Sequence, residues 1–123
     1  MIEVRNLFKR YGAFEALKGI DFEVAAGESV GLLGENGAGK TTTMRILAGF
    51  IPPTSGTVKL AGHEIVFESK AVRRNIGYLP ESVPLYGGMR VQEFLDYRAR
   101  LKGLRGREVK PAVERALGLV DLV

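Results

Sequence analysis

A nine-residue glycine-rich segment, GENGAGKTT at 34–42, constrains this chain more than any other feature. It satisfies the spacing G-x-x-x-x-G-K-[ST] through Gly34, Gly39, Lys40 and Thr41. Glycines allow consecutive backbone N–H groups to curl around a phosphate, the Lys40 ammonium brings a mobile positive charge, and the Thr41 hydroxyl is a ligand for Mg²⁺. The segment therefore predicts a loop that binds the polyphosphate of a nucleoside triphosphate.

We expect every residue of this loop to contribute to nucleotide binding, mainly through the backbone. Thr42 is placed to touch a phosphate oxygen, next to the Mg²⁺ ligand Thr41. The predicted binding residues are Gly34, Glu35, Asn36, Gly37, Ala38, Gly39, Lys40, Thr41 and Thr42. The alternative is a glycine-rich turn that only joins two elements.

The flanking residues favour the binding loop over a plain turn. Before it, the apolar run SVGLL at 29–33 is typical of a strand buried on both faces. After it, residues 39–49 place Met44, Leu47 and Ala48 at helical spacing and close on Gly49, a suitable helix cap. Strand, loop and helix thus follow in the order that a P-loop requires.

The rest of the chain predicts one α/β domain spanning residues 1–123. Alternation of apolar and polar residues predicts antiparallel strands at 2–11 and 16–24 and a short strand at 57–60. Further expected elements are a basic helix at 69–74 capped by Ser69, a strand at 76–79 ended by Pro80, a loop at 81–88, and helices at 91–101 and 107–120. Asp96 and Arg100 are spaced to pair on the first of those two helices.

Composition excludes several classes of function. The chain has 18 Lys and Arg against 14 Asp and Glu, a formal charge of +4, and no cysteine for disulfides or thiolate metal sites. Its basic residues near 98–110 are interleaved with acidic ones, which is typical of solvated helix faces and argues against nucleic acid as a partner. No apolar run approaches the ~20 residues of a membrane span, and the N-terminus lacks a signal-peptide core, so we expect a cytoplasmic protein.

Beyond the loop itself, the run MRILAGFIPPTSGTVKLAGHEI and the segment IGYLPE make the chain resemble the start of an ABC-transporter ATP-binding subunit. The resemblance covers essentially the whole chain and is greatest to subunits paired with ABC-2-type exporter permeases. It implies a partial P-loop NTPase core with N-terminal antiparallel strands and a C-terminal helical segment. It also implies ATP and Mg²⁺ as ligands, a membrane permease and a second ATP-binding subunit as partners, and a position at the inner face of the cell membrane.

The resemblance assigns roles to two residues outside the loop. Tyr11 matches the aromatic residue whose ring stacks on adenine, although an aromatic residue capping a strand edge is the alternative. Glu81 stands where the family usually has a glutamine that reaches Mg²⁺ and the attacking water. A glutamate still offers an oxygen to Mg²⁺, but it has no amide N–H to donate. A solvated loop carboxylate is the alternative for Glu81.

Two other residues are not assigned to the site. His63 precedes the place of the family's switch histidine, so we expect a surface histidine. Asp121 ends an apolar run, but that run continues the helical period from Val109 and is followed by Leu122, which argues against a metal ligand.

The sequence contains no LSGGQ-like signature, no apolar strand ending in Asp-Glu and no switch histidine. It therefore matches the N-terminal part of an ABC ATP-binding domain, with the P-loop and Q-loop region and with no complete catalytic set, as in a truncated subunit. We expect it to bind ATP without hydrolysing it efficiently. The alternatives are a self-sufficient P-loop switch or kinase and a non-enzymatic interaction module.

Overall fold

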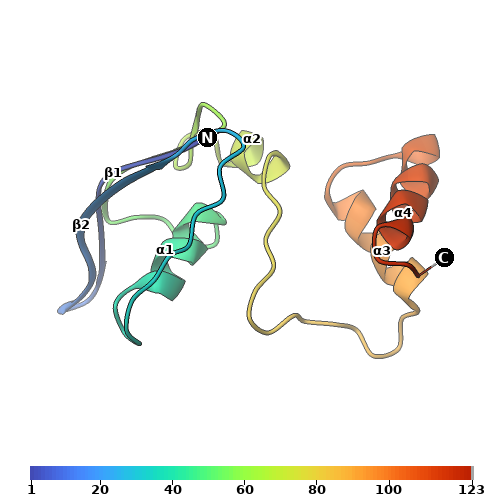
Figure 1. Ribbon diagram of the computed structural model, residues 1–123, viewed down its shortest axis with the longest axis horizontal. Helices are drawn as coiled ribbons and strands as arrows, with labels where there is room; N and C mark the ends of the chain where they lie inside the picture. Colours follow the sequence, from blue (N-terminus) through green and yellow to red (C-terminus); the bar gives the residue numbers. More distant parts are fainter. Residues whose placement is uncertain (123) are drawn as a thin grey trace. The chain divides into compact units, whose positions relative to one another are not determined.

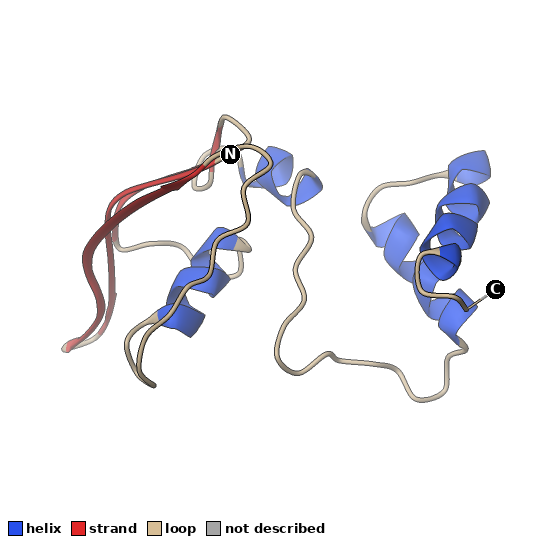
Figure 2. Ribbon diagram, in the orientation of Figure 1, coloured by secondary structure: helices blue, strands red, loops and turns tan. Residues whose placement is uncertain are grey.

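The computed structural model describes residues 1–122 and divides the chain into two compact units. The first unit comprises Met1–Tyr78, and the second begins at Leu79. Figure 1 shows the order of the elements along the chain, and Figure 2 shows that the strands all belong to the first unit whereas the second is helical. The glycine-rich loop lies in the first unit, together with the sheet.

The first unit is built on a four-stranded antiparallel sheet in the order β2-β1-β3-β4. Its strands are β1 (Ile2–Tyr11), β2 (Phe14–Val24), β3 (Ser55–Leu60) and β4 (His63–Glu64). The three longer strands confirm the predictions, with β2 and β3 each starting two residues early. The short β4 was not predicted. It follows a two-residue turn in which Ala61 and Gly62 have φ of 49° and 80°, as tight hairpin turns require.

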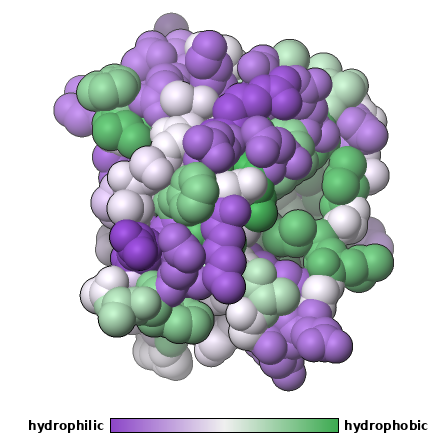
Figure 3. Space-filling view, turned by 90° about the vertical axis from the view of Figure 1, so that its left-hand side faces the viewer, coloured by the Kyte–Doolittle hydropathy of each residue, from purple (hydrophilic) through white to green (hydrophobic). Residues whose placement is uncertain are grey.

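One face of this sheet packs on the core and the other faces solvent. Val4, Leu7 and Val58 are fully buried, and the whole core comprises Val4, Leu7, Leu17, Ile46, Val58, Leu60, Ile65 and Val72. On the strands, Arg5 pairs with Glu23 and Arg10 lies 3.6 Å from Glu15. Figure 3 faces the β1–β2 side of the molecule and shows hydrophilic residues, in purple, interspersed with apolar ones. The sheet is therefore amphipathic, as the alternation predicts.

The first helix, α1 (Lys40–Leu47), follows the glycine-rich loop and ends as predicted near Gly49. Gly49 has φ of 76°, its N–H donates to Ile46 O at 2.9 Å, and the Phe50 N–H donates to Arg45 O at 2.9 Å. These two bonds form a Schellman cap, which satisfies the last carbonyls of the helix. The helix buries Thr43 and Ile46 rather than Met44, which is 43% exposed.

The short helix α2 (Ser69–Arg74) is present, but its N-cap is Glu68 and not the predicted Ser69. The Val72 N–H donates to Glu68 O at 3.1 Å, so Glu68 is the cap residue and Ser69 is already helical. Val72 is fully buried and anchors the helix in the core.

The predicted buried strand at 29–33 is wrong. These residues have no regular structure, and Val30, Leu32 and Leu33 are 57%, 43% and 92% exposed. A strand needs a neighbour to accept its backbone hydrogen bonds, and in the described part of the chain the sheet strands pair only with one another. The apolar run has the composition of a buried strand, but no strand lies beside it in residues 1–122.

The predicted strand at 76–79 is also wrong. Residues 75–80 carry no regular structure, and Leu79 is 81% exposed. Within the first unit, Ile76 and Tyr78 line a cavity of about 340 Å³ together with Met44 and Leu47 of α1. The segment thus lines a cavity beside α1 instead of joining a sheet.

The second unit contains α3 (Val91–Leu101), the 3₁₀ turn η1 (Gly106–Glu108) and α4 (Val109–Gly118). The Asp96 carboxylate accepts a bond from Arg100 Nε at 2.7 Å, as the helical spacing predicts. Val109 and Val113 are buried, whereas Val120 lies beyond the end of α4 and is 61% exposed. Among residues 1–122, no helix is long and apolar enough to cross a membrane.

Strand β1 is irregular at Asn6, where it meets Gly56 of β3. The pairing of β1 with β3 shifts register between Arg5 and Phe8, and Asn6 has a left-handed φ of 46° with its N–H bonded to Asp21 Oδ1 at 2.9 Å. A Cβ on Gly56, whose φ is 91°, would lie 2.2 Å from Asn6 O. This position therefore requires glycine for backbone conformation and for space alike.

We predict that Gly56→Ala lowers the free energy of unfolding of the first unit by about 3 kcal/mol, because the clash is with backbone and cannot be relieved by a rotamer change. Gly62→Ala is the matched control. Gly62 also has a positive φ, of 80°, but a Cβ added there would have no atom within 4 Å. The control is expected to cost only about 1 kcal/mol. Urea denaturation followed by circular dichroism measures both, and equal losses would contradict the prediction.

Candidate functional site

The glycine-rich loop is pressed against strand β2 where it meets α1. Gly39 has φ of 95°, and a Cβ there would lie 2.5 Å from Leu17 Cδ2 and 2.8 Å from Ala16 O. Gly37 is left-handed as well, with φ of 85°, but has open space around it. Gly39 is thus required for packing and conformation, and Gly37 for conformation alone.

The start of α1 presents free backbone donors to this loop. The first bond into the helix is donated by Thr43, whose N–H and hydroxyl both reach Gly39 O, at 2.9 and 2.8 Å. The N–H groups of Lys40, Thr41 and Thr42 precede that bond. No side chain caps the helix, and its first turn carries no acidic residue. An uncapped helix N-terminus next to a loop with glycines at 34, 37 and 39 fits a phosphate group.

The Lys40 side chain folds back over the loop. Its ammonium donates to the carbonyl oxygens of Gly34 and Glu35, the second at 2.8 Å. The Ala38 N–H donates to Glu35 O at 3.1 Å and closes the turn. The ammonium therefore already lies at the loop, where a phosphate oxygen can replace a carbonyl as its partner.

The remaining loop residues are accessible. Glu35, Asn36, Ala38 and Thr41 are exposed, and Thr42 is half-buried at the start of the helix. The Thr41 hydroxyl is thus open to a metal ion bound with phosphate, and the chemistry of a hydroxyl oxygen suits Mg²⁺. The structure brings the nine predicted loop residues together, and their binding roles stay predictions.

Glu81 belongs to the other unit. It is exposed and lies in the irregular segment before α3. Thr41 belongs to the first unit, so a Mg²⁺ site shared by Thr41 and Glu81 stays a prediction. Among residues 1–122, no three His, Asp or Glu side chains form a cluster that could hold a metal ion.

Tyr11 lies at the end of β1, next to the hairpin turn, and is 46% exposed. Two residues earlier, Lys9 pairs in register with Leu17, the residue that contacts Gly39. Figure 1 shows the tip of the β1–β2 hairpin and the glycine-rich loop at the same, lower end of the first unit. This arrangement suits a ligand whose phosphates lie in the loop and whose base reaches the strand end.

The sequence interpretation missed one contact of Tyr11. The Lys9 ammonium lies over its ring, 5.1 Å from the centroid. The only signal in the sequence is the spacing of two residues in a strand, which places both side chains on one face.

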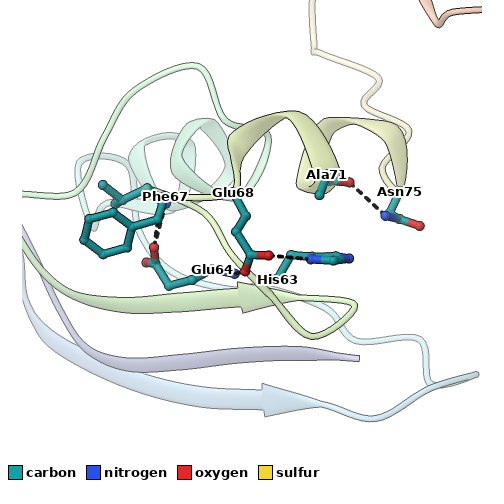
Figure 4. A network of polar contacts seen from close by, with 7 residues as sticks. His63, Glu64, Phe67, Glu68, Ala71 and Asn75 are labelled. Carbon is teal, nitrogen blue, oxygen red and sulfur yellow. Dashed lines mark hydrogen bonds and ion pairs between the residues drawn. The ribbon is translucent and has the colours of Figure 1, made fainter.

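His63 is held by a polar network away from the loop (Figure 4). Its Nδ1 lies 3.0 Å from Glu68 Oε1, and the other oxygen of Glu68 accepts the Glu64 N–H at 2.9 Å. The Glu64 carboxylate in turn accepts the N–H groups of Val66 and Phe67, both at 3.0 Å. The histidine thus ties β4 to the start of α2. Asp121, which the sequence analysis did not assign to the site, is exposed in the turn after α4 and has φ of 53°.

Comparison with known proteins agrees with the geometry of the loop. The family model described as ABC transporter matches residues 17–123. The ABC transporter ATP-binding protein YxlF of Bacillus subtilis (strain 168) is 45% identical over 122 residues, which cover 99% of this chain and 40% of YxlF. The chain thus spans less than half the length of that relative.

Solved structures share the fold. An ATP-binding subunit of an ABC transporter superposes with a TM-score of 0.83 at 32% identity, covering 98% of this chain and 50% of that one. The ATP-binding cassette MJ0796, a dimer bound to ADP and Pi, superposes with a TM-score of 0.79 at 22% identity, covering 98% and 57%. These likenesses confirm the predicted α/β P-loop fold class.

We predict that the Glu68 network makes stability depend on pH. The pKa of the Glu68 carboxyl lies below its ordinary value, chiefly because His63 hydrogen bonds to it and also because the Glu64 N–H does. A lowered pKa in the folded state stabilises the fold above the unfolded pKa of about 4.3, and this contribution is lost as pH falls through the lower value. The advantage of the wild type over Glu68→Gln should therefore shrink as the pH falls below about 5.

Urea unfolding midpoints at a series of pH values measure this difference. Glu114→Gln serves as the control, because its carboxylate forms only a surface pair with Lys110 at 3.8 Å. A difference in unfolding midpoint between wild type and Glu68→Gln that stays constant with pH would show that the carboxylate charge does not contribute to stability.

Proposed function

The chain belongs to the ABC transporter family, and we propose that it is the ATP-binding part of an ATPase that couples ATP binding and hydrolysis to transport through a membrane permease. The family match and the name of the relative YxlF, an ABC transporter ATP-binding protein, support this function. The observation that carries it is the Lys40 ammonium, held over a glycine-rich loop at an uncapped helix N-terminus.

In this proposal the loop binds the phosphates and the strand end binds the base. Backbone N–H groups between Gly34 and Thr42 surround the β-phosphate, and Lys40 exchanges a loop carbonyl for an oxygen of the β- or γ-phosphate. Mg²⁺, when bound, neutralises phosphate charge, with the Thr41 hydroxyl and Glu81 as its protein ligands. The exposed ring of Tyr11 stacks on the adenine.

The proposed partners are a membrane permease and a second ATP-binding subunit. The dimer reported for the cassette MJ0796 supports the second subunit by fold similarity. Exposed apolar side chains of the second unit support the permease, among them Tyr86 before α3 and Val91 and Leu101 on α3, at 56%, 56% and 61% exposure. Docking on a permease would place the chain at the inner face of the cell membrane.

A non-enzymatic interaction module is the alternative that the same exposed surface favours. The two functions differ in the role of the glycine-rich loop, because an interaction module has no need to bind nucleotide. Nucleotide binding by the wild-type chain therefore separates the two.

We predict that Lys40→Ala weakens binding of Mg-ATP by about a hundredfold, equivalent to about 2.7 kcal/mol, because it removes the charge aimed at the phosphates. Lys59→Ala, which removes an exposed lysine of β3, is the matched control and should bind as the wild type does. Titration with a fluorescent ATP analogue measures both. Equal affinity of the two variants would refute the role of Lys40. A preference between ATP and GTP beyond about a hundredfold would point to a base-reading switch protein.

We further predict that these 123 residues bind ATP without turning it over. The family's water-activating glutamate and its signature segment are not in the sequence, so nothing positions the nucleophile against the γ-phosphate. Phosphate release should stay at least about a hundredfold below 1 s⁻¹, the low end for working enzymes. A coupled phosphate assay measures the rate, with Lys40→Ala controlling for contaminating ATPases. A Lys40-dependent rate near 1 s⁻¹ would mean that Glu81 or Asp121 supplies the missing group.

A further inference from the structure

Lys9 makes two contacts at the end of the sheet where Tyr11 lies. Its ammonium donates to Pro52 O at 2.8 Å and lies 5.1 Å from the centre of the Tyr11 ring. Lys9 is half-buried, whereas Tyr11 is 46% exposed. The cation therefore covers one face of the ring and leaves accessible surface elsewhere on it.

The acceptor of this lysine is itself fixed. Pro52 has a restricted φ and the following Pro53 restricts its ψ, so the Pro52 carbonyl has little freedom to turn. Thr54 then clamps the segment to β1, because its N–H donates to Phe8 O at 2.9 Å and its hydroxyl accepts the Arg10 N–H at 3.0 Å. The ammonium is thus held by a rigid segment on one side and faces the ring on the other.

This arrangement links the two ends of the proposed nucleotide site. Helix α1 begins at the phosphate-binding loop and ends at the Gly49 cap, and the chain then returns through residues 50–54 to β1 next to Tyr11. Lys9 is the side chain that joins this returning segment to the aromatic ring.

We propose that Lys9 is a positioning residue for base binding: its ammonium holds the Tyr11 ring from one face, so that the other face is presented to the base of the nucleotide. The inference rests on the proposed function, in which Tyr11 stacks on adenine. A cation over an aromatic ring stabilises the ring position and reads no base edge. Lys9 therefore acts equally on ATP and GTP and does not act on a ligand that has no base.

The test compares Mg²⁺-loaded ATP, GTP and inorganic tripolyphosphate by calorimetric titration of the whole chain. Lys9→Met should weaken both nucleotides by about two- to fivefold, the loss expected for one exposed cation–π contact, and should leave tripolyphosphate affinity unchanged. Lys9→Arg, which keeps the cation, should bind as the wild type does. Lys59→Met is the matched lysine control on β3. Lys9→Gln keeps a donor for Pro52 O without the charge, so it replaces Lys9→Met should that variant lose its circular dichroism spectrum.

Three results would overturn the proposal. An equal loss for tripolyphosphate would mean that Lys9 supports the loop or the fold in general. Tighter nucleotide binding by Lys9→Met would mean that the ammonium obstructs the stacking face. An undiminished effect of Lys9→Met in a Tyr11→Ala background would mean that the lysine does not act through the ring. Two other results would instead contradict the proposed function. Either the wild type would bind neither nucleotide nor tripolyphosphate, or Tyr11→Ala would leave its ATP affinity unchanged.

Discussion

The close approach of Gly39 to strand β2 is the constraint on which the first unit depends. Because no Cβ stands between them, Leu17 and the Ala16 carbonyl set the position of the first turn of α1. That position brings the uncapped N–H groups, the Lys40 ammonium and the end of the β1–β2 hairpin to one end of the unit. The loop is thus positioned by the close packing of Gly39 against Leu17 and the Ala16 carbonyl of β2.

Features that depend on neighbours in sequence were predicted well. The antiparallel strands β1 and β2, the end of α1 at Gly49 and the Asp96–Arg100 pair all follow from local spacing and cap chemistry. The runs at 29–33 and 76–79 were predicted as strands because their apolar composition is typical of buried strands. Composition does not indicate whether a partner strand pairs with the segment, and among residues 1–122 none does.

Contacts between distant residues escaped prediction for the same reason. Nothing near Lys9 in the sequence indicates that Pro52, 43 positions away, accepts its hydrogen bond. The contact of His63 with Glu68 spans only five residues, but the turn at 65–67 that brings them together contains no glycine or proline to indicate it. The glycine-rich loop was recognisable because its residues are contiguous and its glycine spacing matches a known motif, and the binding roles of its residues stay predictions.

The resting position of Lys40 means that the loop carries its own counterion. The carbonyl oxygens of Gly34 and Glu35 carry partial negative charge, so without a cation they would repel an approaching anion. With the ammonium bonded to Gly34 and Glu35, those dipoles are already compensated and the entrance has a positive group in place. In the proposed function, phosphate binding is then an exchange of hydrogen-bond partners at Lys40, from loop carbonyls to phosphate oxygens.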